Sequence, residues 1–369
     1  MKILLFIPAL NAGGAERVMV TIANYLVCEG NTVEILTLNT DNSFYMIDKR
    51  IQVKGMNLII TNTGLKRKFD ILYMEFMRRR EFIRETNKFN PDVVLSFLNT
   101  TNFIALSAKK QVSCPIIVSE RNDPLCYSKF IQFLCKKIYK KADILVCQGK
   151  KVSDYYKKFG IDCRVVPNPL NSKAVGLYTG NWKNKIVTVG RLIEAKNQQM
   201  LIKAFAKISD KYPDYTVEIY GEGPLKEDLY NLIKKLNLEN RVLLCGNKKN
   251  IMTLVSDYCC FVLSSNYEGF PNVLLEAMAS GLPVISTNFS TGIANELIKN
   301  GVNGYVIDTN DINKLSSKLE KLIVDENLNL TMRKNNLIMN KNYSEDLICK
   351  RWSSLLKEQS DRGHNDRKA

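Results

Sequence analysis

The feature that most constrains the fold is a repeated unit, in which a short apolar run is followed by a turn and then by a helical pattern. In the first half of the chain the expected strands are Ile3–Ile7, Thr32–Thr37, Asp92–Phe97, Pro115–Ser119 and Asp143–Cys147. The expected helices there include Ala15–Cys28, Lys68–Thr86 and Lys129–Lys140. Parallel strands need long crossover connections, which are usually helices, so this rhythm predicts an α/β fold with a parallel sheet.

The rhythm stops at Val165–Pro169, where two prolines in three residues hold the chain extended, and it then restarts. The later expected strands are Lys185–Val189, Thr216–Tyr220, Arg241–Cys245, Cys259–Leu263, Pro283–Thr287 and Tyr305–Ile307. We therefore expect two Rossmann-like domains that face each other across a cleft. Their expected limits are 1–166 and 185–343, with a linker at 167–184, a last helix over 344–358 that crosses back to the first domain, and a polar tail at 359–369.

Net charge narrows the choice of partner. The chain of 369 residues carries a formal charge of +16, and residues 1–170 hold 26 Lys and Arg against 15 Asp and Glu, whereas the remainder holds 27 against 22. A basic first half predicts an anionic partner: nucleic acid, anionic lipid or a phosphate-bearing substrate. No apolar run approaches the roughly 18–20 residues that span a bilayer, so an integral membrane protein is not expected.

Scarce residue types exclude several chemistries. The only histidine is His364, in the polar tail, which excludes a core histidine as base or ligand. The 10 cysteines show no C-x-x-C spacing, which argues against a zinc site or a disulfide framework and favours reduced cytosolic thiols. No Asp-x-Asp pair is present, which disfavours carboxylates that hold a magnesium–phosphate complex.

The strongest motif spans residues 268–281. Glu268 and Glu276 stand with seven residues between them, and Pro271 suits the first turn of a helix that Gly281 ends. Glu268 is then expected in the loop before the helix and Glu276 inside it, where the helix N-terminus can offer N–H groups to an anion. The alternative is a capped surface helix with two solvated glutamates.

Two cations follow the expected strand Lys185–Val189. Arg191 and Lys196 stand between this strand and the next helix, where they can bind a diphosphate: arginine by its planar fork, lysine as a point charge. They would also stabilise negative charge on a departing diphosphate. Basic residues at the ends of loops are, alternatively, often only solvated.

Glycine-rich and charged loops follow three other expected strands. Gly13-Gly14 allows a close backbone approach but matches neither the dinucleotide fingerprint nor the P-loop, and a plain tight turn is the alternative. Gly221–Pro224 is interpreted as a turn that starts a helix. Arg121, in the charged loop Ser119–Pro124, either contacts an acceptor phosphate or forms a local salt bridge.

In combination these residues resemble a retaining glycosyltransferase of family 4 with the two-domain GT-B fold. The matching landmarks are Gly13-Gly14, Pro167-Asn168-Pro169, Gly190-Arg191 with Lys196, Gly221-Glu222-Gly223 and the pair Glu268 and Glu276. They stand in the family's order and cover the chain from residue 1 to about 310. The resemblance implies transfer of a sugar from a nucleotide-diphosphate donor with retention of its anomeric configuration, without a metal or other cofactor.

The resemblance also implies roles for individual residues. Arg191 and Lys196 would bind the donor diphosphate, Glu276 the ribose hydroxyls and Glu268 the hydroxyls of the donor sugar. Further donor contacts would come from Gly14, Asn247 near the base, and the segment Gly269, Phe270, Pro271 and Asn272. A UDP-linked hexose or N-acetylhexosamine is expected rather than GDP-mannose.

This chain departs from the family at one position. Many members carry a histidine near the reacting sugar, but the corresponding segment here is Ser96–Asn102. Asn99 or Asn102 would take over its contact, and Asn99 and Arg121 are the expected residues on the acceptor side. The leaving diphosphate can itself accept the proton that the acceptor loses.

Two helical segments with basic flanks predict a membrane partner. Lys66-Arg67-Lys68 and Arg78-Arg79-Arg80 flank one aromatic-rich segment, and Lys136-Lys137 with Lys140-Lys141 follow Phe130 and Phe133 in another. Such helices can lie on an anionic membrane, or their apolar sides can pack on the sheet. We expect a cytoplasmic enzyme, peripheral at the inner face of the membrane, that acts on a polyprenyl-diphosphate-linked glycan in bacterial surface-polysaccharide synthesis.

Two other functions stay open on the sequence alone. A sugar-nucleotide epimerase or hydrolase could use the same architecture without an acceptor. A basic nucleic-acid-binding protein is the other alternative, but the sequence lacks a helix-turn-helix, finger or aromatic RNA-binding signature. A nucleic-acid partner is therefore not expected.

Overall fold

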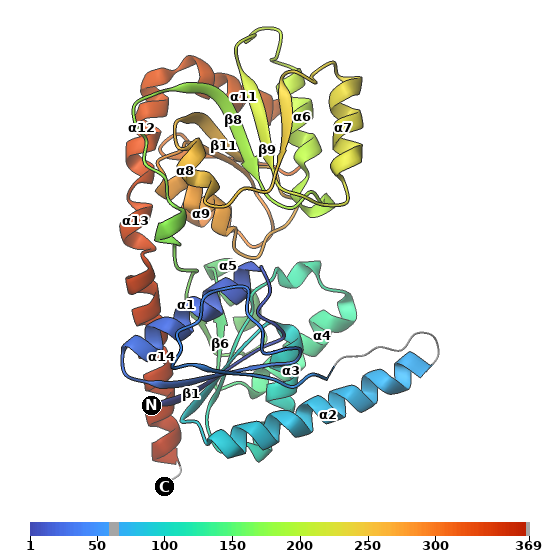
Figure 1. Cartoon of the computed structure of the whole chain (residues 1–369), viewed down its shortest axis with the longest axis vertical. Coiled ribbons are helices and arrows are strands. Elements are labelled where there is room, and N and C mark those ends of the chain that lie inside the picture. The colour runs from blue at the N-terminus through green and yellow to red at the C-terminus, as the bar shows by residue number, and fades with distance from the viewer. Residues whose placement is uncertain (59–65, 367–369) are drawn as a thin grey trace. The chain divides into compact units, whose positions relative to one another are not determined.

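The computed structural model describes residues 1–58 and 66–366, without the side chains of residues 66–70, 72 and 364–366. The interpretations of Lys66-Arg67-Lys68 and of His364 as side chains therefore lie outside the described residues. The chain divides into two compact units, Met1–Pro169 with Glu345–Ala369 (unit 1) and Leu170–Ser344 (unit 2). Figure 1 shows the course of the chain through both units.

Unit 1 contains a 7-stranded parallel sheet in the order β3-β2-β1-β4-β5-β6-β7. Its strands are β1 (Lys2–Ile7), β2 (Thr32–Thr37), β3 (Gln52–Gly55), β4 (Val93–Phe97), β5 (Ile116–Ser119), β6 (Ile144–Cys147) and β7 (Cys163–Val165). Its helices are α1 (Gly14–Cys28), α2 (Lys66–Phe89), α3 (Asn99–Ser107), α4 (Lys129–Ile138), α5 (Lys150–Lys157) and α14 (Glu345–Asp366).

Both faces of the unit 1 sheet are buried because side chains alternate along each strand. Ile3 and Leu5 of β1 belong to a core shared with α1 and α14. Leu4 and Phe6 point to the other face, where the ring of Phe6 stacks on Phe82 of α2 with 4.8 Å between centroids. Strands covered on both faces read as continuous apolar runs, which is why this rhythm was visible in the sequence.

The last helix is longer than the sequence indicates. The tail expected at 359–369 is helical as far as Asp366, and Gln359 and Ser360 are buried. Gly363 permits this approach to unit 1, because a Cβ atom at that position would lie 2.6 Å from Cγ of Pro115. The polar composition of residues 359–366 therefore did not indicate that this segment continues the last helix and packs on unit 1.

Unit 2 contains a 6-stranded parallel sheet in the order β10-β9-β8-β11-β12-β13. Its strands are β8 (Lys183–Val189), β9 (Thr216–Tyr220), β10 (Val242–Gly246), β11 (Tyr258–Leu263), β12 (Val284–Thr287) and β13 (Gly304–Ile307). Its helices are α6 (Gln198–Ala206), α7 (Lys226–Lys235), α8 (Ile251–Val255), α9 (Asn272–Ala279), α10 (Ile293–Leu297), α11 (Ile312–Val324), α12 (Glu326–Asn336) and α13 (Met339–Asn342). The predicted fold class, α/β with two parallel sheets, is confirmed.

Most of the expected linker is packed against unit 2. The Gly176 amide donates to Ser280 Oγ at 2.9 Å, and the Thr179 amide and hydroxyl donate to the Asp257 carboxylate at 2.7 and 2.9 Å. Strand β8 begins at Lys183, before the expected end of the linker. The two prolines thus mark the change from unit 1 to unit 2, but the residues after them are hydrogen-bonded to unit 2 and do not form a free linker.

Within the described part of the chain, no helix combines the length and apolarity needed to cross a bilayer.

Candidate functional site

An ion pair joins the loops that follow β8 and β11 in unit 2. Lys196 Nζ lies 2.5 Å from Glu268 Oε1, and Ser265 Oγ donates to the same carboxylate oxygen at 2.6 Å. The two charged side chains are only 19% and 11% exposed. The pair therefore couples a cation and a carboxylate that the sequence separates by 72 positions.

Backbone hydrogen bonds hold these two loops in register. Asn266 donates through its amide to the Ala195 carbonyl at 2.8 Å and through its side chain to the Glu194 carbonyl at 3.0 Å. Asn197 adopts a left-handed conformation, with φ of 46°, and its side chain donates to Asn266 Oδ1. Sequence reasoning missed this network; its one sequence signal is that asparagine tolerates positive φ better than most residues.

Glycines allow the loop after β9 to pack on the loop after β8. A Cβ atom on Gly221 would lie 1.9 Å from the Gly190 carbonyl oxygen, and one on Gly223 would lie 2.4 Å from the Leu192 carbonyl oxygen. The Leu192 amide donates to the Glu222 carbonyl at 3.0 Å. The segment interpreted from sequence as a simple turn thus supports the segment that carries Arg191.

The two cations predicted here lie in different environments. Arg191 is exposed, and its carbonyl accepts a bond from Gln198 Nε2 at 2.9 Å. Lys196 is held in its ion pair, and its aliphatic stem lies beside Gly190, where a Cβ atom would meet Lys196 Cδ at 3.5 Å. A lysine held in an ion pair and an exposed arginine therefore follow the same strand.

Helix α9 places the second glutamate. It starts at Asn272 directly after Pro271, its first helical bond runs from the Leu274 amide to the Pro271 carbonyl, and Gly281 with φ of +78° ends it. Glu276 is 8% exposed, so the interpretation as a surface helix with two solvated glutamates is wrong. The amides at the start of a helix lie outside its regular hydrogen-bond pattern. In α9 these amides directly follow the loop that carries Glu268.

The other residues predicted in this region lie around the same helix start or at the sheet edge. Gly269 and Asn272 are partly buried, and Phe270 and Pro271 are buried. Asn247 is exposed and follows Gly246, which has φ of 66° at the end of β10.

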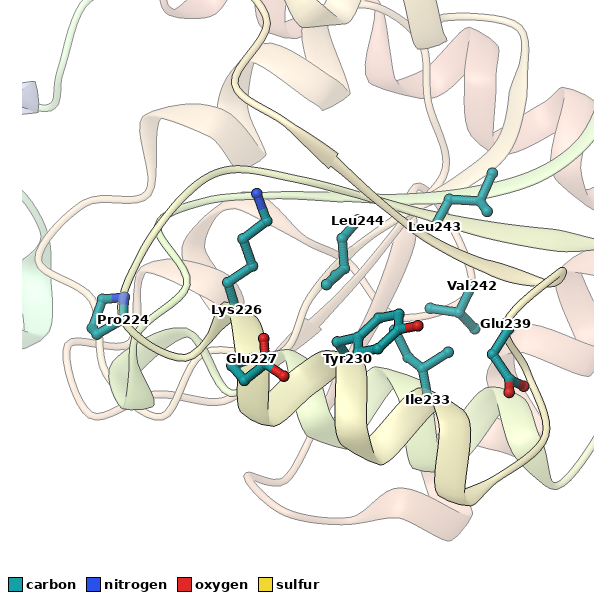
Figure 2. A pocket seen from close by; sticks show the side chains of 9 residues that line it. All are labelled: Pro224, Lys226, Glu227, Tyr230, Ile233, Glu239, Val242, Leu243 and Leu244. Atoms are coloured by element: carbon teal, nitrogen blue, oxygen red, sulfur yellow. The ribbon is translucent and has the colours of Figure 1, made fainter.

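A separate pocket of about 680 Å³ lies between α7 and the edge strand β10. Figure 2 shows its lining residues, among them Tyr230 and Ile233 of α7 and Val242 and Leu244 of β10. None of the residues predicted for the functional site lines it. The pocket therefore does not explain the Lys196–Glu268 pair.

In unit 1, the predicted glycine turn begins α1. Gly13 precedes the helix and Gly14 is its first residue. The Glu16 carboxylate folds back over Gly13, where a Cβ atom would lie 2.1 Å from Glu16 Oε2, and Tyr45 Oη donates to the Gly13 carbonyl at 2.8 Å. The missing side chain at Gly13 thus makes room for the glutamate.

The asparagines that follow β4 differ in accessibility. Asn99 is the first residue of α3 and is partly exposed. Asn102 is buried, and its side-chain amide donates to the Ser119 carbonyl at 3.0 Å and to Tyr139 Oη at 3.4 Å. Asn102 is therefore held by contacts inside unit 1, and Asn99 is the more accessible of the two asparagines.

Arg121 is buried rather than paired on the surface. It is 5% exposed, its guanidinium lies 4.4 Å from the Phe97 ring centroid, and Nη2 donates to Asn168 Oδ1 at 2.5 Å. Burial lowers its pKa to about 9. Among the described residues no carboxylate forms an ion pair with it.

Within unit 2 the structure brings together Lys196, Glu268, the start of α9 and the neighbouring Arg191; within unit 1 the strand ends carry Gly14, Asn99 and Arg121. The described residues contain no group of three or more histidines, cysteines or carboxylates placed to hold a metal ion.

Comparisons with known proteins match both units. The family profile "Glycosyltransferase Family 4" matches residues 12–173, and "Glycosyl transferases group 1" matches residues 179–338. A Campylobacter jejuni protein, "GalNAc-alpha-(1->4)-GalNAc-alpha-(1->3)-diNAcBac-PP-undecaprenol alpha-1,4-N-acetyl-D-galactosaminyltransferase", is 30% identical over 362 residues, 97% of this chain and 99% of its own.

A second curated relative and a solved structure are also similar to this chain. An Escherichia coli "UDP-Gal:alpha-D-GlcNAc-diphosphoundecaprenol alpha-1,3-galactosyltransferase" is 35% identical over 272 residues, 66% of this chain and 69% of its own. The crystal structure of Anabaena HepE in complex with UDP superposes with a TM-score of 0.80 at 18% identity and covers 97% of this chain and 100% of that one. The last comparison shows the shared fold.

Proposed function

This chain belongs to glycosyltransferase family 4, and we propose that it transfers a hexose or N-acetylhexosamine from a UDP-sugar to a lipid-linked glycan. The anomeric configuration of the sugar is retained, and the acceptor is carried on a polyprenyl diphosphate during assembly of a bacterial surface polysaccharide. The names of the relatives support this substrate class: both specify acceptors with a diphosphate-linked undecaprenol.

The observation that carries the proposal is the Lys196–Glu268 pair beside the start of α9. In the free chain Glu268 neutralises Lys196. When the donor binds, its phosphate oxygens accept from Lys196 and Arg191, while Glu268 accepts from hydroxyl groups of the donor sugar. Glu276, which lies one turn after the start of α9, binds the ribose hydroxyls.

These groups act mainly on the leaving group. As the bond between sugar and diphosphate breaks, negative charge grows on the diphosphate, and fixed cations and helix-start amides stabilise it most where water is excluded. The leaving diphosphate accepts the proton that the acceptor hydroxyl loses. Loss of one such cation typically slows transfer about 100-fold or more.

A membrane-facing surface fits a lipid-linked acceptor. On α4, Phe130 and Phe133 are 68% and 59% exposed, and Lys129, Lys137, Lys140 and Lys141 are exposed around them. We assign this surface to an anionic bilayer at the inner face of the cell membrane, with each lysine near the lipid contributing about 1 kcal/mol. Replacement of both phenylalanines by serine should then reduce sedimentation of the protein with phosphatidylglycerol vesicles.

The proposal is tested by transfer from a panel of radiolabelled UDP-sugars to polyprenyl-diphosphate-linked acceptors. Lys196→Ala and Glu268→Gln should each abolish most of the transfer, whereas Lys203→Ala, at a partly exposed lysine on α6, should leave it unchanged. Transfer that survives both site variants would refute the assignment. A donor that is isomerised or hydrolysed while no acceptor is elongated would favour an epimerase or hydrolase instead.

A further inference from the structure

Arg121 carries a buried positive charge whose hydrogen bonds are incomplete. Its Nη2 atom donates to Asn168 Oδ1, but Nε and Nη1 have no hydrogen-bond partner among the described residues, although both are shielded from solvent. A buried donor without a partner costs about 1–3 kcal/mol, and more when the group is charged. Such a group calls for an explanation, and the explanations known from proteins are strain, a functional role, or a bound water or ion.

The neighbouring carboxylate does not supply the missing bonds. Glu120 is buried, and its oxygens accept from the hydroxyls of Tyr127, Tyr139 and Tyr156 at 2.8, 3.1 and 3.1 Å and from the amides of Arg121 and Asn122 at 3.0 and 3.2 Å. These five donors occupy the carboxylate. Glu120 therefore balances the charge of Arg121 without forming an ion pair with it, and fixes the loop on which Arg121 stands.

The position of Arg121 is that of a ligand site in an open parallel sheet, where ligands bind outside the carboxyl ends of the strands. Phe97 is the last residue of β4, Arg121 follows β5, and Asn168 follows β7. Gln148, directly after β6, donates to the same Asn168 oxygen at 2.8 Å. Three further strand ends thus hold the guanidinium in place.

The backbone beside this group is strained. Leu98 follows Phe97 with φ of 74° and ψ of 146°, a conformation that side chains with a Cβ atom rarely adopt. Its amide donates to the Ser119 carbonyl at 3.3 Å, so the loops after β4 and β5 are joined here. Strain of this kind costs about 1–3 kcal/mol and clusters at binding and catalytic sites.

We propose that Arg121 binds a diphosphate group of a substrate, whose oxygens accept hydrogen bonds from Nε and Nη1. The inference rests on the proposed function, since that function brings two diphosphates to the enzyme, one on the sugar donor and one on the lipid acceptor. Charge-assisted bonds to phosphate are among the strongest that arginine makes. Because both donors are shielded, the anion reaches them after a local shift of the loops after β4 and β5.

Binding of two soluble probes to the full-length protein tests the inference without knowledge of the sugar. Isothermal titration with UDP probes the donor diphosphate, and titration with farnesyl diphosphate probes a prenyl diphosphate acceptor. The variants are Arg121→Gln, which removes the charge, and Arg121→Lys, which keeps the charge but lacks the fork. Arg164→Gln is the matched control, because Arg164 is an exposed arginine of the same unit.

We expect Arg121→Gln to lose about tenfold or more in affinity for one of the probes, which is about 1.4 kcal/mol, and Arg121→Lys to lose less, while Arg164→Gln binds both like wild type. Loss for farnesyl diphosphate assigns the acceptor, and loss for UDP assigns the donor. If Arg121→Gln folds and binds both probes like wild type, the inference is overturned. If Arg121→Gln does not fold, wild-type affinity of Arg121→Lys for both probes overturns it.

The proposed function fails in a different way. If wild type binds UDP, Lys196→Ala abolishes that binding and the Arg121 variants bind both probes normally, the donor site stands and the inference about Arg121 is wrong. If wild type binds neither probe, both are wrong.

Discussion

Gly221→Ala tests the glycine contact that joins the loops after β8 and β9 in unit 2. Gly221 has φ of +147°, and a Cβ atom there would lie 1.9 Å from the Gly190 carbonyl oxygen. The unfavourable conformation costs about 1–3 kcal/mol, and the backbone shift that relieves the clash costs about 1–3 kcal/mol more. We therefore expect a loss of roughly 2–6 kcal/mol in the free energy of unfolding of unit 2.

Gly301→Ala is the control for strain without a clash. Gly301 lies in the same unit with φ of +77°, and a Cβ atom there would have nothing within 4 Å. The control should lose about 1–2 kcal/mol, the ordinary cost of a left-handed residue that carries a Cβ atom.

The two tryptophans make the assay specific, because Trp182 lies in unit 2 and Trp352 in unit 1. In a Trp352→Phe background, urea unfolding followed by fluorescence reports unit 2 alone. Gly221→Ala should also weaken UDP binding, since the displaced Gly190 precedes Arg191, whereas Gly301→Ala should bind UDP normally. Equal destabilisation by the two substitutions, with UDP affinity intact in both, would refute this explanation.

Further predictions concern unit 1. Leu98→Gly should be about 1 kcal/mol more stable to urea than Leu98→Ala, because glycine relieves the strain at φ of 74°; equal stabilities would contradict the strain. Trp352→Ala should cost about 3–5 kcal/mol in unfolding experiments, since this indole is fully buried against Phe97, and a loss below about 1 kcal/mol would show that α14 is dispensable. Burial and Asp123 raise the pKa of the Cys126 thiol to about 11, so at pH 8 about one molecule in a thousand carries the reactive thiolate. Peptide mass spectrometry should therefore show slow alkylation of Cys126 by iodoacetamide and faster alkylation in Asp123→Asn; a rate unaffected by that substitution would contradict the cause assigned to the shift.

The sequence predicted the central strands well because they are buried on both faces. Ile3–Ile7 is a continuous apolar run for this reason. The edge strands β3 and β7 were missed, since they are short and include charged residues such as Lys54 and Arg164. Their identity as strands depends on pairing with a neighbour, which no local pattern shows.

Individual residues of the candidate site could be predicted from the sequence, but the contacts between them could not. Sequence position and the family resemblance singled out Lys196 and Glu268, but their pairing follows from the adjacency of β8 and β11 in the sheet. The burial of Arg121 had no sequence signal, because it depends on Phe97 and Asn168 from two other strand ends. Contacts of this kind depend on which strands are neighbours in the sheet. Apolar periodicity predicts the fold class but not the order of the strands.

The measurement that tests the account most directly is the structure of the transfer product. Wild-type protein is incubated with α-linked UDP-sugars and a polyprenyl-diphosphate-linked glycan, and the new linkage is analysed by proton NMR alongside the product of Lys196→Ala. The account predicts an acceptor lengthened by one α-linked sugar, and none with the variant. A β-linked product, free sugar without an elongated acceptor, or an equal yield from Lys196→Ala would contradict it.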